Sequence, residues 1–368
     1  MYVDSIFDPA ATTLPRLECP PINPSRYKPL KAARRQGNES RIQYFFALDL
    51  RECLELLPRL LGSVVDAMRF LGPDRCALSI VGGDSTDGTD DVLAALTPAL
   101  QAIGVASYTF QTAALNSTDG PRIHILAELR NLALEPLFHG DHPVSADVGD
   151  DTTVLFINDV AACAEDILEL ALQRRNLGAD MTCAFDWVNP FDDDGPTFYD
   201  VWVSRTIRGD WYFDIPPDTG GWEHSHNLFW NDPATRARFD ALLPFQVFSC
   251  WNGATAFGAK PVLEGLRFRA SNEDVDECFQ GEPQLFCKDL WWRGFGKIAV
   301  VPTVNLEYTN DKGRKVKELK GYTSDLVRGK SEADMRIDWA VEPPEKVLCA
   351  PGFDRQDWRA WNETLDLQ

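Results

Sequence analysis

The feature that most constrains the fold is a regular alternation of apolar runs and amphipathic segments between residues 42 and 186. Short apolar runs typical of buried strands are each followed by a stretch in which apolar residues recur at helical spacing. The predicted strands are Ile42–Leu50, Ala77–Val81, Val105–Phe110, Thr152–Ile157 and Met181–Phe185. The predicted helices are Leu54–Phe70, Asp90–Ile103, Ile123–Leu137 and Ala164–Asn176. This alternation predicts the α/β class, with a parallel sheet and right-handed crossovers.

The alternation stops after residue 186, where the chain becomes rich in Trp, Tyr, Pro, Asp and Gly. Strands are predicted more weakly in this half, at Tyr199–Ser204, Phe245–Phe248, Ala254–Phe257 and Ile298–Val301. We therefore expect a leader or stem over residues 1–40, a main domain over 41–310 and an extension over 311–368. The main domain divides into halves over 41–186 and 187–310, and the extension is polar and is predicted to be irregular.

Charge excludes two classes of partner. The chain has 368 residues and a formal net charge of −20, so it lacks the basic surface that nucleic acid and anionic membranes require. A membrane-spanning helix needs about 18 or more consecutive apolar residues. The sequence contains no such stretch, and we predict no membrane segment in this chain.

The cysteines exclude one kind of metal site. Nine cysteines are scattered along the chain without any Cys-x-x-Cys pair, so a structural zinc site is not expected. Disulfides are plausible if the chain is secretory, but their pairing cannot be read from the sequence. Cys183 lies in an apolar run and is predicted to be a buried thiol.

The most informative motif is Val154–Val160, in which four apolar residues lead directly into Asn158 and Asp159. In open α/β sheets, ligands bind outside the carboxyl ends of the strands, which is where these two side chains are expected. A carboxylate there can hold Mg²⁺ or Mn²⁺, and such an ion can hold a phosphate. The alternative is an Asx turn or a cap for the following helix.

Two further segments are candidates for nucleotide contacts. In the loop Gly82–Thr89, Asp84 can accept hydrogen bonds from a base or a ribose, although the loop can also serve only to cap the next helix. Arg130, on the helix before the Asp159 strand, can neutralise a diphosphate. The alternative for Arg130 is an ion pair within its helix, for example with Glu135.

Candidate sugar contacts lie in the second half of the chain. Trp251 can cover a sugar face and Asn252 can bond its hydroxyls, with Gly253 in the same turn, unless the segment is only a packed hairpin. Glu282 and Asp289 lie at the start of and within a predicted helix that begins near Gln284. Either carboxylate can contact an acceptor hydroxyl or a donor sugar, and together they could form a glycosidase pair. The alternatives are helix N-terminal charge for Glu282 and a solvent-facing Asp289.

These motifs, in this order, resemble the fungal capsule-associated α-1,3-mannosyltransferases. The resemblance covers roughly residues 40–310. The matching segments are Phe45–Leu50, Gly82–Asp91, Leu129–Asn131, Val154–Val160, Glu165–Leu168, Tyr199–Trp202, Trp251–Gly253, Leu285–Leu290 and Gly294–Gly296.

The resemblance implies a GT-A-like, Rossmann-type nucleotide-binding sheet, with an acceptor-binding C-terminal half. It implies a retaining glycosyltransferase that moves mannose from GDP-mannose to a glycan, in α-1,3 linkage and with Mn²⁺ or Mg²⁺. Leu48 and Asp49 would join Asp84, Arg130 and Asn158 in binding the sugar nucleotide.

The resemblance also implies a place in the cell and roles in the reaction. It implies the Golgi lumen, with the membrane anchor absent from this chain. Asp159 would hold the metal, while Asp289, in preference to Glu282, would orient the acceptor or stabilise positive charge on the sugar. The usual Asp-x-Asp motif of such folds is replaced here by Asn158-Asp159-Val160, and Tyr308 lies where a late His ligand is common.

Two other classes of function stay open on the sequence alone. One is a glycoside hydrolase that uses paired carboxylates, and the other is a non-catalytic carbohydrate-binding protein. Within the transferase hypothesis, a different donor such as UDP-xylose or UDP-glucose is also compatible, because the loops around Asp49 and Asp84 set the choice of base.

Overall fold

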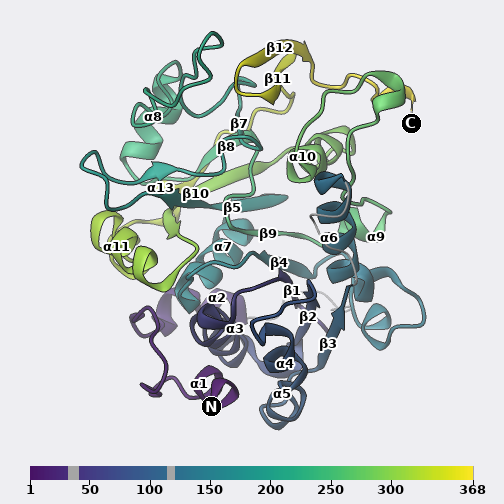
Figure 1. The fold of residues 1–368 in the computed structure, drawn as a ribbon, viewed down its shortest axis with the longest axis vertical. Helices are drawn as coiled ribbons and strands as arrows, with labels where there is room; N and C mark the ends of the chain where they lie inside the picture. The colour runs from purple at the N-terminus through teal and green to yellow at the C-terminus, as the bar shows by residue number, and fades with distance from the viewer. Residues whose placement is uncertain (32–40, 114–120, 368) are drawn as a thin grey trace.

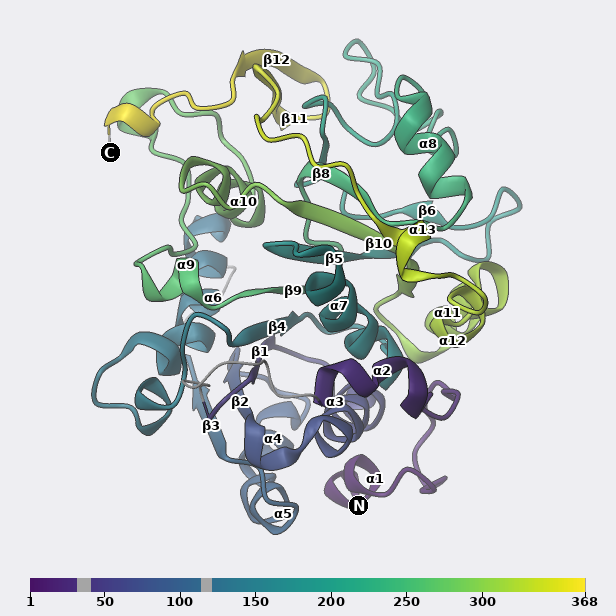
Figure 2. The same ribbon diagram turned by 180° about the vertical axis from the view of Figure 1, so that it is seen from behind.

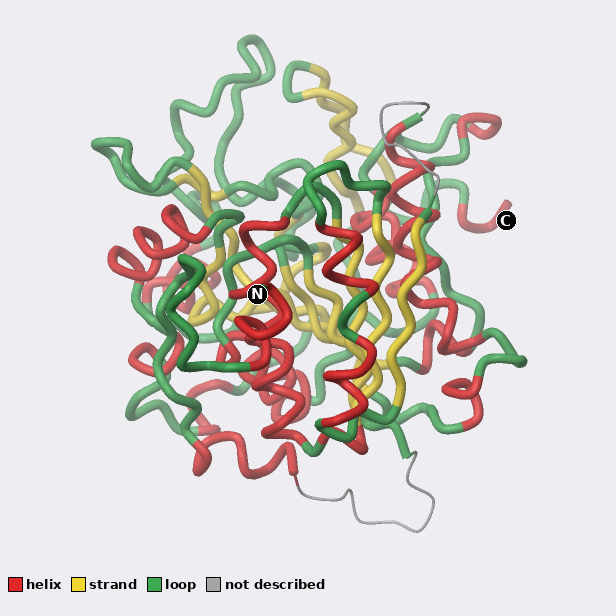
Figure 3. The backbone as a smooth tube through the Cα atoms, turned by 60° about the horizontal axis from the view of Figure 1, so that its bottom comes forward, coloured by secondary structure: helices red, strands yellow, loops and turns green. Residues whose placement is uncertain are grey.

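A computed structural model describes residues 1–31, 41–113 and 121–367. Part of the predicted leader, residues 32–40, and the last residue of the predicted extension therefore lie outside the described chain. The structure confirms the α/β class: a large central sheet lies between helices, with strands in the middle of the molecule and helices at its flanks (Figure 3).

The strands of the central sheet follow the order β3-β2-β1-β4-β9-β5-β10-β8-β7, which runs from bottom to top in Figure 1, and β6 pairs with β5. Strands β1, β2, β3 and β4 are mutually parallel, as the alternation predicts. The strands are β1 (Tyr44–Leu50), β2 (Cys76–Gly82), β3 (Ser107–Thr112), β4 (Thr153–Ile157), β5 (Met181–Val188), β6 (Thr197–Phe198), β7 (Arg205–Thr206), β8 (Phe245–Ser249), β9 (Ala254–Gly258) and β10 (Ile298–Leu306).

Helices cover both faces of the sheet, and each face has its own apolar core (Figure 2). Along β1 the side chains alternate, so that Phe45 and Ala47 enter the core beneath α6 and α10, while Phe46 and Leu48 enter the core beneath α3 and α7. The helices of the first half are α1 (Tyr2–Phe7), α2 (Pro24–Lys31), α3 (Leu57–Leu71), α4 (Thr89–Ala94), α5 (Thr97–Ala102), α6 (Arg122–Phe138) and α7 (Ala164–Leu177). Those that follow are α8 (Pro233–Asp240), α9 (Lys260–Leu263), α10 (Glu282–Trp292), α11 (Asn310–Lys320), α12 (Thr323–Leu326) and α13 (Glu332–Met335).

The sheet is mixed rather than wholly parallel. Strand β9 pairs antiparallel with both β4 and β5, and so separates two strands that follow each other in the alternation. The helix predicted over Asp90–Ile103 is two helices, α4 and α5, because Pro98 lies in the first turn of α5 and cannot donate a hydrogen bond to an extension of α4.

Two predictions for the second half are wrong. Residues 199–204 form turns rather than a strand, since the backbone N–H of Val201 donates to the carbonyl of Tyr199 within the same segment. Residues 311–368 are not irregular: they contain α11, α12 and α13 and a hairpin of β11 (Lys346–Gly352) and β12 (Arg355–Ala360). Polar sequence hid these elements, since β12 is largely exposed.

Three disulfides join segments that are distant in sequence: Cys19–Cys163, Cys183–Cys250 and Cys278–Cys349. The prediction of a free thiol at Cys183 is therefore wrong, because its apolar strand lies beside the segment that carries Cys250. Cys53, Cys76 and Cys287 are free and buried.

Candidate functional site

A cavity of about 640 Å³ opens at the carboxyl ends of β1, β2 and β4. Asp49 and Arg51 come from the end of β1, Gly83 follows β2, and Asn158 and Asp159 follow β4. Helix α6, the N-terminus of α10 and two loops rich in aromatic residues complete its walls. This is the edge at which open α/β sheets bind ligands.

Two carboxylates, Asp159 and Asp49, line the cavity close together. Burial raises the pKa of Asp159 to about 6, with a further contribution from the negative charge of Asp49 and an opposing one from Arg130. Burial also raises the pKa of Asp49. Their mutual repulsion makes a cation the favoured occupant of the space between them.

Arg130 lies at the centre of the site and is almost completely buried, with 6% of its surface exposed. Its Nε donates to Glu282 Oε1 at 2.9 Å, and its Nη1 donates to Asn158 Oδ1 at 3.4 Å. The guanidinium also lies 4.4 Å from the centre of a Trp251 ring. Burial alone would lower the pKa of Arg130, but Asp49 and Glu282 outweigh that effect and raise it. Arg130 thus compensates the negative charge of Glu282 and Asp49. The alternative that the sequence left open, an ion pair with Glu135 in the same helix, is not the one that forms.

A second acidic pair, Asp186 and Asp200, lies next to this centre. Asp200 lines the cavity, and burial raises its pKa to about 6. Burial and the charge of Asp200 raise the pKa of Asp186 well above its ordinary value, while Tyr308 donates to Asp186 Oδ2 at 2.5 Å. Sequence reasoning missed this cluster, because its members come from β5, a turn and the end of β10. The only available signal was the Tyr199–Trp202 motif.

Two cations of the cavity were also missed. Arg51 follows β1 directly, and Arg122 begins α6, so both lie near the entrance of the site. Both are exposed, and neither forms an ion pair with another side chain in the described ranges. Arg51 could have been predicted from the sequence, because it follows Asp49 by two residues at the end of the same strand.

Of the remaining predicted residues, some line the cavity and others do not. Trp251 lines the cavity, whereas Leu48 is buried in the core and is not on its wall. Asp84 has a positive φ of 55° and is exposed, outside the cavity lining. Asn252 is completely buried, and it bonds Ser204 and the carbonyl of Ala184 rather than facing the open space.

Gly253 has a structural requirement of its own. Its φ is +82°, and a Cβ there would approach Val160 Cγ1 to 3.0 Å. Its carbonyl accepts the backbone N–H of Asn158 at 2.9 Å, which holds the turn after β4 in place. Gly253 thus supports the Asn158–Asp159 turn from the neighbouring strand, β9.

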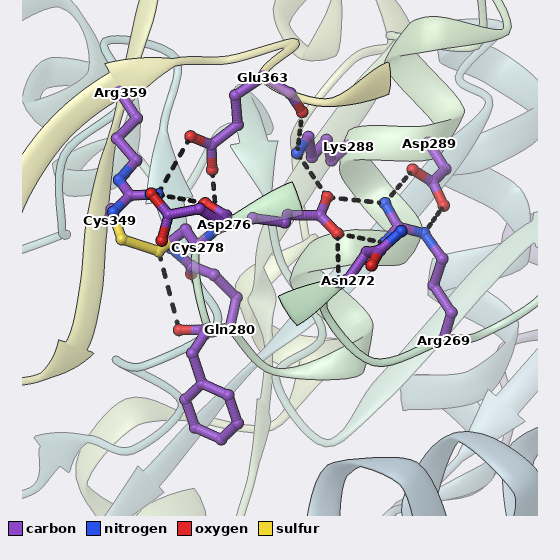
Figure 4. A network of polar contacts seen from close by, with 12 residues as sticks. Arg269, Asn272, Asp276, Cys278, Gln280, Lys288, Asp289, Cys349, Arg359 and Glu363 are labelled. Carbon is purple, nitrogen blue, oxygen red and sulfur yellow. Dashed lines mark hydrogen bonds and ion pairs between the residues drawn. A yellow bond between two sulfur atoms is a disulfide. The ribbon is translucent and has the colours of Figure 1, made fainter. Parts of the chain in front are cut away.

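Asp289, by contrast, is not brought to the cavity. It forms a paired contact with Arg269, at 2.7 Å from Nε to Oδ2 and 2.8 Å from Nη2 to Oδ1 (Figure 4). Arg269 also binds Glu277, which accepts a hydrogen bond from Lys288 Nζ at 2.7 Å. Asp289 thus belongs to a polar network behind α10, and only Glu282 of the two predicted carboxylates lines the cavity.

The donor set fits a divalent cation that keeps most of its shell for phosphate and water. No group of three or more His, Cys, Asp or Glu side chains suited to a metal occurs in the ranges 1–31, 41–113 and 121–367. Mg²⁺ and Mn²⁺ need only one or two carboxylates when phosphates complete the coordination. Asp159, with Asp49 beside it, supplies such a set.

Comparison with known proteins identifies the family. The family model described as "Cryptococcal mannosyltransferase 1" matches residues 43–289. The chain belongs to this family. The α-1,3-mannosyltransferase CMT1 of Cryptococcus neoformans var. neoformans serotype D is 36% identical over 360 residues, which span 93% of this chain and 74% of the relative. Membership in the family confirms the predicted resemblance and the prediction of a glycosyltransferase enzyme.

Two solved structures are similar at lower identity. The mannosyltransferase PcManGT from Pyrobaculum calidifontis, in complex with GDP-Man and Mn²⁺, has 12% identity and a TM-score of 0.42, covering 84% of this chain and 72% of that one. S. aureus TarS 1-349 has 15% identity and a TM-score of 0.40, covering 79% of this chain and 68% of that one. In the described part of the chain, no helix has the length and apolar character needed to cross a membrane.

Proposed function

We propose that this member of the family transfers mannose from GDP-mannose to a hydroxyl of a glycan, in α-1,3 linkage and with retention of configuration. The observation that carries the proposal is the meeting of Asp159, Asp49 and Arg130 in one cavity at the carboxyl edge of the sheet. That arrangement offers acidic oxygens for a cation and a fixed positive charge in the place where a diphosphate is expected.

The donor occupies the end of the cavity nearest the strand tips. Gly83 leaves room for the Arg51 side chain, since a Cβ there would lie 2.9 Å from Arg51 Cβ, and half-buried Leu126 supplies apolar surface for a base. Arg51 and Arg122 supply positive charge at the cavity of a chain whose formal net charge is −20. The N-terminus of α6, a helix of 17 residues, begins at Arg122 and adds favourable potential for phosphate.

Asp159 would hold Mn²⁺ or Mg²⁺, with Asp49 as the second carboxylate of the site. When bound, the ion acts as a Lewis acid that stabilises negative charge on the leaving diphosphate. Asn158 keeps Arg130 in place beside it, since its Oδ1 accepts from Arg130 Nη1 and from Trp251 Nε1, the latter at 3.0 Å. The pairing of Arg130 with Glu282 therefore orients two charged groups toward the same reacting centre.

Retention by front-face attack needs no dedicated protein base, because an oxygen of the departing phosphate accepts the proton of the acceptor hydroxyl. Glu282 would orient that hydroxyl, since it lines the cavity and its carboxylate is fixed by Arg130. The hydrolase alternative, which the sequence placed on Glu282 and Asp289, has less support, because Asp289 is bound to Arg269 and does not line the cavity.

The disulfides support a location in the secretory pathway. Three long-range disulfides are typical of proteins that fold in an oxidising compartment and are rare in cytosolic ones. The Golgi lumen, where glycans are extended, satisfies that condition, and we propose it as the site of action.

The experiment is a panel of GDP-, UDP- and ADP-sugars in a thermal-shift assay with and without Mn²⁺, followed by mass spectrometry of products. GDP-mannose with Mn²⁺ should give the largest increase in melting temperature. A mannobiose acceptor should then gain one hexose. Release of free sugar from a glycoside without any nucleotide would instead support the hydrolase.

A further inference from the structure

We propose that the aromatic wall of the cavity, formed by Trp202, Trp222 and Phe353, is the subsite that binds a neutral pyranose ring of the acceptor. This inference rests on the proposed function, because it assigns the part of the cavity that the donor leaves open. All three side chains line the same space as Asp159 and Glu282, and each ring is half-buried. Part of each ring therefore stays available to a ligand.

The rings are held by contacts behind them. Trp222 packs edge-on against Phe353 with ring centres 5.4 Å apart, and Phe353 packs against buried Trp211 at 5.6 Å. Trp202 Nε1 donates to the carbonyl of Ala350 at 2.8 Å. These contacts fix the ring planes before any ligand arrives, which lowers the entropy lost on binding.

The wall also has the polar partners that a sugar requires. A pyranose has an apolar face of C–H groups and a rim of hydroxyls, so it suits an aromatic surface next to acceptor oxygens. Asp200 and Glu282 line the cavity together with the wall. Asp200 accepts a hydrogen bond from the backbone N–H of Asn252 and Glu282 accepts one from Arg130 Nε, and each carboxylate has further lone pairs to accept from sugar hydroxyls. Trp251, where the sequence placed the acceptor, is instead 1% exposed beneath Arg130.

Phe353 comes from the C-terminal hairpin, which lies beyond the part of the chain that the family model matches. The Cys278–Cys349 disulfide attaches β11 to the segment that leads into α10 and Glu282. Lys288 Nζ donates to the carbonyl of Glu363 at 2.9 Å, which attaches the end of the hairpin to the same helix (Figure 4). The hairpin and Glu282 are therefore placed as one unit on either side of the acceptor.

The test uses Phe353→Ala and Trp222→Ala in steady-state kinetics with mannobiose as acceptor. Loss of a ring contact should raise the acceptor KM about tenfold, which corresponds to roughly 1.4 kcal/mol. The affinity for GDP-mannose with Mn²⁺, measured by calorimetry, should stay within about twofold of that of the unaltered protein. Trp358→Ala is the matched control, since Trp358 lies on β12, is 46% exposed and does not line the cavity.

Three results separate this inference from the proposed function and from misfolding. An unchanged acceptor KM in both variants would overturn the subsite, and so would an equal loss of donor affinity. If the unaltered protein binds no GDP-mannose, the proposed function fails, and saturation-transfer NMR with mannobiose alone then tests the wall directly. Phe353→Leu keeps an apolar side chain without the ring and serves as the folded reference. It should melt at the temperature of the unaltered protein, and its acceptor KM should still be raised.

Discussion

Asp159 is half-buried beside Asp49, and this position makes its ionised form less favourable. A raised pKa means that the folded state holds the ionised form less well than the unfolded chain does. We expect Asp159→Asn to lower turnover about 100-fold or more, since the charge that holds the cation is lost. The melting temperature should stay the same or rise.

The control for that change is Asp193→Asn, in an exposed turn that does not line the cavity. It should leave both turnover and the melting temperature unaltered. Normal turnover in Asp159→Asn would remove the metal role that we assign to this residue.

Arg130 is the counter-charge of two carboxylates, the buried Glu282 and the half-buried Asp49. Arg130→Met would leave both without it, and we expect the free energy of unfolding in urea to fall by about 3–5 kcal/mol. Glu282→Gln in the same chain should recover part of that loss, because it removes one uncompensated charge. Simple additivity of the two changes would argue against the pairing.

At this scale the sequence predicted the residues with a strong local context and missed those that depend on distant segments. Asp159 follows an unmistakable strand, and Arg130 lies on the neighbouring helix. Asp200 and Tyr308 both reach Asp186 only because a turn and the segment after β10 converge on β5. Such convergence has no signature in one sequence.

Helix α10 and the C-terminal hairpin are joined by the polar network behind the site (Figure 4). Its centre is Glu277, whose side chain is fully buried between Arg269 and Lys288. Burial would raise the pKa of Glu277, but the two cations outweigh it and lower that pKa to about 2.

A carboxylate whose pKa is lower in the folded state stabilises the fold above its unfolded pKa, and the effect is lost as the pH falls through the folded value. Glu277→Gln should therefore cost on the order of 2 kcal/mol of unfolding free energy at pH 7. The difference from the unaltered protein should shrink steadily between pH 5 and about 2. Glu273→Gln, exposed on the same loop, should show no such pH dependence. A difference that stays constant with pH would contradict the network.

The disulfide in this unit closes a loop of 71 residues between Cys278 and Cys349. On the chain-entropy model, removing it with Cys278→Ser and Cys349→Ser should lower the free energy of unfolding by about 4 kcal/mol. Guanidinium unfolding without reductant measures the change. Cys53→Ser, at a free and buried thiol, is the comparison. An effect no larger than that of Cys53→Ser would mean that the hairpin is held mainly by its polar contacts.

Helices and strands were predicted correctly where hydrophobic periodicity is strong. They were missed or misplaced where the pairing of distant strands decides their position in the sheet. Four of the first five strands, β1, β2, β4 and β5, were found because each is buried on both faces, while β3 lies at the sheet edge and is only half-buried. The insertion of β9 between β4 and β5 is a property of pairing over a long sequence separation. The hairpin β11–β12 was missed because its outer strand is mostly exposed and reads as polar.

On the scale of the whole molecule, the sign of the charge at the cavity wall differs from the sign of the net charge. A chain with a net charge of −20 gathers Arg51, Arg122 and Arg130 around one cavity. In a chain of this net charge, three arginines on one cavity make its wall suited to a diphosphate.

A crystal structure of the complex with GDP-mannose and Mn²⁺ would test whether Asp159 holds the metal ion that binds the donor diphosphate. We expect the diphosphate to lie in the cavity at the carboxyl edge of the sheet, near Arg130 and joined to the Asp159 carboxylate through the metal ion. Phosphates found away from Asp159, for example in the separate cavity bordered by Arg26 and Arg328, would contradict it.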